Sequence, residues 1–168
     1  MFPPILHQVL EELTKHPPQD EAKWDGPWNA ILATLFPGHF VSPLGRISKD
    51  SYRTPYLLFE VSKPTNNKPP RKYRTVLVVA VMNYPDWHAG VPFLEAEINR
   101  QADAAFTSGT IGTAISKLYW VGAIGPHWQY GIKDQGQELK PLIAWHGTIH
   151  DEASYDDFKD LAALITDM

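Results

Sequence analysis

The sequence contains no cysteine among its 168 residues, which excludes disulfide bridges, thiolate metal sites and a cysteine nucleophile. Long apolar runs are also missing, since no segment approaches the roughly 20 apolar residues of a transmembrane helix. The start, MFPPILHQVLEEL, lacks both the basic residues and the uninterrupted apolar stretch of a signal peptide. These absences predict an intracellular protein with no membrane partner.

An excess of basic residues is lacking too, and the formal net charge is −4. Such a chain has no overall attraction for nucleic acid, so any nucleic-acid binding requires a local basic patch. Apolar residues at 43% and charged residues at 20% are ordinary for a globular protein. We find no repeat, low-complexity segment or linker, and therefore expect a single domain over residues 1–168.

Apolar residues at helical spacing predict four helices. The first two have the stripes Ile5, Leu6, Val9, Leu10, Leu13 and Trp28, Ile31, Leu32, Leu35. The third is expected from Pro92 to about Phe106, with an inner face of Leu94, Ile98, Ala102, Ala105 and Phe106. The last is expected from Ser154, with Asp157 completing an approximate capping box.

Strand signals lie between these helices. A weak strand is predicted at Phe40–Ile47 and stronger ones at Tyr56–Lys63 and Thr75–Asn83, the latter apolar enough for burial on both faces. The segments LYWVGAIG and HWQYGIK, separated by Pro126, predict a hairpin, and PLIAWHG predicts one more short strand. The order predicts an α/β (α+β) domain in which helices flank a mixed central sheet.

Four segments, RTPYLLFEV, VVAVMN, NRQADAAF and KLYWVGAIGPHWQYG, occur in an order that resembles the PD-(D/E)XK nuclease superfamily. The chain is most similar to a fungal branch, in which R-x-P-D-F precedes V-E-V-K and a helix rich in Ala, Asp and Gln leads into L-Y-x-x-x-A-I-G. The resemblance covers about residues 50–133. It implies a restriction-endonuclease-like core of a helix, three strands, a helix and a strand.

In that superfamily an Asp and a Glu bind a divalent metal, and a Lys positions or activates the attacking water. The matching positions here are Tyr56, Ala80 and Met82, and none of these side chains can perform those roles. The resemblance therefore implies a degenerate motif, with no catalytic residue, metal or cofactor. Because alternate strand residues share a face, Ala80 and Met82 are expected to form part of an apolar core.

Relocated catalytic groups remain an alternative. Glu60 shares a face with Tyr56, although its Cα lies about 13 Å further along the strand. Together with Lys63 and with Glu97 or Asp103 it could hold Mg²⁺ or Mn²⁺ in a metal-dependent nuclease. The simpler interpretation makes Glu60 a strand-end carboxylate and Glu97 a solvated helix residue.

A basic segment, KPTNNKPPRKYR, joins the two strong strands, and no acidic residue lies between Val61 and Val81. Its cations are Lys63, Lys68, Arg71, Lys72 and Arg74. They could contact phosphate or an acidic partner, or simply belong to a solvated loop that its prolines stiffen. On the later hairpin, Trp128 and Tyr130 share a face, where they could stack on bases or pack in the core.

The segment WHGTIHDE offers a weaker candidate, because His146, His150 and the following acids could hold zinc or manganese. Gly147 argues against the helix that this histidine spacing requires. Asp151 is instead expected to precede the final helix, where negative charge is favoured.

The leading hypothesis from sequence is a non-catalytic descendant of a nuclease scaffold that binds nucleic acid or a protein. The alternative is the metal-dependent nuclease with relocated carboxylates. A third possibility is a protein whose scaffold serves self-association.

Overall fold

The computed structural model of the protein describes residues 1–47, 56–66, 68–70, 72–108 and 115–168. Its helices are α1 (Pro4–Lys15), the 3-10 turn η1 (Glu21–Trp24), α2 (Asp25–Leu35), α3 (Trp87–Thr107) and α4 (Glu152–Thr166). Its strands are β1 (Phe40–Ile47), β2 (Tyr56–Pro64), β3 (Tyr73–Met82), β4 (Lys117–Ile124), β5 (His127–Asp134) and β6 (Lys140–Pro141). No helix in these ranges combines the length and apolar character needed to cross a membrane.

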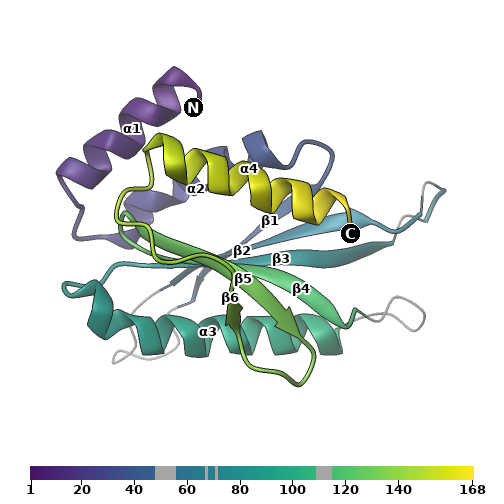
Figure 1. Cartoon of the computed structure of the whole chain (residues 1–168). Helices are drawn as coiled ribbons and strands as arrows, with labels where there is room; N and C mark the ends of the chain where they lie inside the picture. The colour runs from purple at the N-terminus through teal and green to yellow at the C-terminus, as the bar shows by residue number, and fades with distance from the viewer. Residues whose placement is uncertain (48–55, 67, 71, 109–114) are drawn as a thin grey trace.

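The strands form one six-stranded sheet in sequence order, from β1 to β6. Strands β3 and β4 are parallel, and every other neighbouring pair is antiparallel. The parallel pair needs a crossover connection, which α3 provides. Helices α1, α2 and α4 cover one face of the sheet and α3 covers the other (Figure 1). This is the restriction-endonuclease-like arrangement of an antiparallel three-stranded meander, a crossover helix and a parallel strand.

Each face of the sheet has its own apolar core, because side chains alternate along a strand. Leu77, Val79 and Val81 of β3 pack toward α1, α2 and α4, whereas Val78, Ala80 and Met82 pack toward α3. The expected burial of this strand on both faces is therefore confirmed.

The expected stripe of α1 is only partly correct. Leu6 and Leu10 are buried, but Ile5 is 80% exposed and Val9 also reaches the surface. Leu13 packs against the edge of the same core, so Ile5 and Val9 are the members of this stripe that lie at the surface.

Two helices begin earlier than the sequence predicted. Helix α3 starts at Trp87, because the Asp86 side chain accepts a hydrogen bond from the His88 N–H at 3.1 Å, and Pro92 lies inside the helix. Helix α4 starts at Glu152, where Asp151 accepts from the Ser154 N–H at 2.7 Å. The expected role of Asp151 at this N-terminus is confirmed, whereas the capping box with Asp157 was wrong.

The predicted strand over PLIAWHG was also wrong in extent. Only Pro141 of that segment lies in the two-residue strand β6, and His146 adds an isolated bridge to Trp128. Leu142 N–H donates to the Tyr130 carbonyl at 3.0 Å, and the chain meets β5 again where the His146 N–H donates to the Trp128 carbonyl at 2.9 Å.

Gly131 on β5 marks the closest packing in the sheet. A Cβ atom added there would lie 2.2 Å from the main-chain oxygen of Lys140 and 2.4 Å from the Trp120 ring. The oxygen belongs to β6, so a side chain at position 131 would separate the last two strands. Gly26 on α2 has nothing within 4 Å of the equivalent position.

We expect Gly131→Ala to lower the free energy of unfolding by roughly 2–3 kcal/mol, since the clash involves main chain and an inflexible indole. Gly26→Ala should be neutral or slightly stabilising, because alanine is the better helix former. Urea denaturation of both variants beside the wild type measures the difference. Equal stability of the two variants would show that β6 is not held against β5 as described.

Candidate functional site

The three positions that match the nuclease motif lie side by side in the sheet. Tyr56 pairs with Met82, and Leu58 pairs with Ala80, across β2 and β3. Tyr56, Ala80 and Met82 are 8%, 1% and 0% exposed and belong to the core beneath α3. The Tyr56 hydroxyl donates to the main-chain oxygen of Phe93 in α3 at 3.2 Å. These side chains therefore attach α3 to the sheet.

The alternative set is not assembled around Glu60. Glu60 lies on the α3 face of β2, where the Thr75 hydroxyl donates to its carboxylate at 3.4 Å. Burial raises the pKa of the Glu60 carboxyl, and the Thr75 hydrogen bond opposes this effect. Lys63 lies on the opposite face, since its Nζ donates to the main-chain oxygen of Thr166 in α4 at 3.0 Å. The sheet thus separates the carboxylate from the lysine that was expected to assist it.

The two candidate acids of α3, Glu97 and Asp103, are also apart from each other. Glu97 is 8% exposed, and its carboxylate accepts hydrogen bonds from Arg100 and Gln101. The expectation that Glu97 is a solvated residue was therefore wrong, because its helical neighbours cover it. Asp103 follows six residues later, about 600° of helical rotation, and faces Lys133 of β5 at 3.6 Å. Within the described residues, no group of three or more His, Cys, Asp or Glu side chains could hold a metal ion.

The basic segment forms the end of the β2–β3 hairpin, which projects from the sheet (Figure 1). Two of its cations form hydrogen bonds with the main chain at the end of α4. Lys63 Nζ donates to Thr166, and an Arg74 guanidinium nitrogen donates to the main-chain oxygen of Met168 at 2.6 Å. Cations at the C-terminal end of a helix bind its free carbonyl groups and favour its dipole. These two residues therefore join the hairpin to the end of α4.

A bulge in β3 directs Arg74 toward α4. Val61 pairs with Leu77 but Ser62 pairs with Thr75, so Val76 is an extra residue. Val76 and Leu77 consequently lie in the same core, and the alternation of side chains reverses before them. Arg74 thus points to the α4 face, and Tyr73 to the other.

The remaining described cations of the hairpin, Lys68 and Lys72, are exposed; we refer to them as the hairpin lysines. Hydrogen bonds hold the backbone that carries them. The Lys72 N–H donates to the Asn66 side chain at 2.9 Å, and the Thr65 N–H donates to the Lys72 carbonyl at 2.8 Å. Arg71 lies outside the described residues. The hairpin lysines are the part of the predicted basic segment that the structure leaves available for a ligand.

The aromatic residues expected to accompany them lie elsewhere. Trp128 is 0% and Tyr130 is 4% exposed, so neither ring can stack on a base. The Trp128 indole lies parallel to Phe158 of α4 at 3.7 Å, and its N–H donates to Ser154 at 2.9 Å. Both rings belong to the core because α4 covers this face of the hairpin.

A second pair of rings, missed in the sequence, lies at the base of the β2–β3 hairpin. Phe40 at the start of β1 and Tyr73 at the start of β3 are 59% and 48% exposed, and their ring centroids are 6.0 Å apart. We call them the aromatic pair. The sequence signal was the position of each ring at the first residue of a strand, where little core is available to cover it.

His146 and Asp151 of the WHGTIHDE segment have structural partners. His146 Nε2 lies 2.5 Å from the Asp157 carboxylate, and Asp151 caps α4. His150 contacts the ring of His7 and the hydroxyl of Thr14, both in α1. The segment thus connects α4 to α1 and β5.

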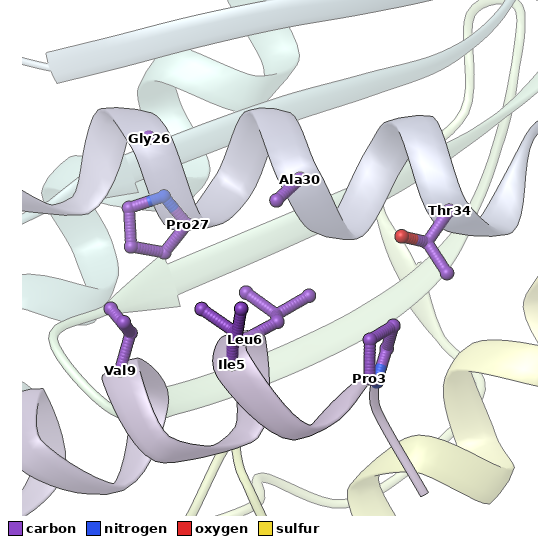
Figure 2. Close-up of a pocket in the computed structure, with 8 residues that line it drawn as sticks. All are labelled: Pro3, Ile5, Leu6, Val9, Gly26, Pro27, Ala30 and Thr34. Carbon is purple, nitrogen blue, oxygen red and sulfur yellow. The ribbon is translucent and has the colours of Figure 1, made fainter.

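An apolar groove of about 390 Å³ runs between α1 and α2 (Figure 2). Figure 2 shows Pro3, Ile5, Leu6 and Val9 on one side and Gly26, Pro27, Ala30 and Thr34 on the other. The exposed stripe of α1 forms one wall. This groove is the apolar surface feature that an association with another protein would use.

No family model matches this chain, and neither does any curated protein. The resemblance to the PD-(D/E)XK superfamily therefore rests on the order of the four segments alone.

We expect Arg74→Met to lower the free energy of unfolding by about 1–2 kcal/mol, because it removes a charged hydrogen bond at the end of α4. Lys72→Met is the matched control, since this exposed neighbour should change stability by less than about 0.5 kcal/mol. Urea denaturation at constant salt compares the two variants. Equal stability would contradict the link between hairpin and helix.

The Glu60 carboxyl predicts a pH dependence of stability. A raised folded-state pKa means that folding favours the protonated form, so this contribution is complete below the ordinary pKa of 4.5. It is lost as the pH rises through the raised value. We therefore expect Glu60→Gln to gain stability relative to the wild type across this window and then to level off. Urea denaturation of both proteins at a series of pH values measures the difference in their free energies of unfolding. A difference that does not change with pH would contradict this expectation.

Proposed function

We propose that the protein is a non-catalytic relative of the PD-(D/E)XK nucleases that binds nucleic acid through the end of its β2–β3 hairpin. The observation that carries this proposal is the exposure of the hairpin lysines on a hydrogen-bonded backbone, in a segment free of acidic residues. In a protein of net charge −4, this is the local basic patch that phosphate binding requires.

The non-catalytic part of the proposal draws support from the motif positions. Tyr56, Ala80 and Met82 supply a phenol, a methyl group and a thioether in the core beneath α3. A metal-dependent phosphoryl transfer needs carboxylate oxygens on a hard cation and a route for water. Neither is offered by these three side chains.

The binding is electrostatic in character. Lysines at the end of a projecting hairpin can approach the phosphate backbone while the acidic remainder of the surface stays away from it. Each phosphate contact releases counterions, so affinity falls steeply as salt rises.

Binding to a fluorescent oligonucleotide, titrated at several salt concentrations, tests the proposal. We expect Lys68→Ala/Lys72→Ala to weaken binding and to reduce the slope of log affinity against log salt by about 2. A Lys23→Ala/Lys140→Ala double variant removes the same charge from exposed sites elsewhere and should leave the slope near that of the wild type.

Two outcomes would overturn the proposal. Cleavage that requires Mg²⁺ or Mn²⁺ and disappears in Glu60→Ala/Glu97→Ala would establish a nuclease with relocated carboxylates. Failure to bind any oligonucleotide, with salt-insensitive association to a protein or to itself, would favour the groove between α1 and α2 as the working surface.

A further inference from the structure

The aromatic pair presents two largely exposed rings at the surface of the sheet. Phe40 and Tyr73 come from strands that are not neighbours, since β2 lies between them, yet their rings meet across it at 6.0 Å. The rings are inclined by 47°, and the two residues are 59% and 48% exposed.

The aromatic pair and the hairpin lysines lie toward the same end of the sheet. Lys72 directly precedes Tyr73, and Phe40 pairs with Ser62 of β2, close to the base of the same hairpin. The bulge at Val76 places Tyr73 on the face opposite Arg74, so the ring is turned away from α4. Exposed rings and exposed lysines therefore lie toward one end of the sheet.

We infer that the aromatic pair and the hairpin lysines together form a site for single-stranded nucleic acid, with unpaired bases stacking on Phe40 and Tyr73. This inference rests on the proposed function and names its ligand class. Lysines alone bind any phosphate backbone, whereas a ring face is useful only to a base that is not already stacked in a duplex. The shared chemistry is an unpaired base beside a phosphate, which both DNA and RNA provide.

The ring of Tyr73 contributes its surface rather than its hydroxyl. Base–aromatic stacking is worth about 1–3 kcal/mol per base by alanine substitution, which corresponds to about 5-fold to about 140-fold in affinity per ring. Tyr73→Phe keeps the ring and should bind as the wild type does. Phe40→Leu keeps an apolar side chain without a π face and should lose most of the contribution.

The experiment compares a dT12 strand, an rU12 strand and a 12-base-pair duplex at one salt concentration. We expect the wild type to prefer the single strands, and Phe40→Ala/Tyr73→Ala to lose about 25-fold or more on them with little change on the duplex. Phe93→Ala is the matched control, because Phe93 is equally exposed on α3 and should leave all three affinities unchanged. Thermal unfolding of each variant confirms that the fold is retained.

The outcomes separate the two proposals. Suppose that the lysine variant loses binding, while Phe40→Ala/Tyr73→Ala either weakens binding to single strands and duplex equally or leaves both unchanged. In that case the stacking inference fails and the proposed function stands. If the wild type binds no oligonucleotide, both fail. A preference for dT12 over rU12, or the reverse, identifies the sugar without altering the inference.

Discussion

Strand β3 is covered on both faces, by α1, α2 and α4 on one side and by α3 on the other, and both cores meet on its side chains. Burial of this kind excludes an ionisable side chain unless a partner compensates for its charge, and Leu77–Met82 contains none. The strand also carries the register of the sheet, since it joins the antiparallel meander to the parallel strand β4. The packing of α3 and the position of the hairpin both follow from it.

This burial moves the surface available for binding toward the ends of the sheet. The positions that match the nuclease motif lie under α3, while the exposed lysines and rings lie on the β2–β3 hairpin and at the adjacent start of β1. The residues that stabilise a scaffold differ from those that contact a ligand, so the fold alone does not define the function.

Element order and the apolar faces could be predicted from sequence because they depend on local periodicity, as the strand at Phe40–Ile47 and the inner face of α3 show. The partners of polar and aromatic residues could not. Arg74 finds the end of α4 some 94 positions away, and Trp128 lies under Phe158. Glu97 is covered by its own helical neighbours. Such contacts depend on packing between distant elements, about which composition and spacing carry no information.

The extra residue in β3 has a wider consequence. A strand with uninterrupted alternation would place Arg74 on the same face as Val78 and Ala80, and Tyr73 on the face of α4. The bulge puts the two ends of this strand out of phase, so the chemistry displayed by the hairpin depends on a count of residues rather than on their identity. A related chain with the same hairpin residues but regular pairing at Val76 would present its arginine where this protein presents a ring. Composition alone would assign the two chains the same surface. On the face turned away from α4, however, one chain would display the tyrosine ring and the other the arginine.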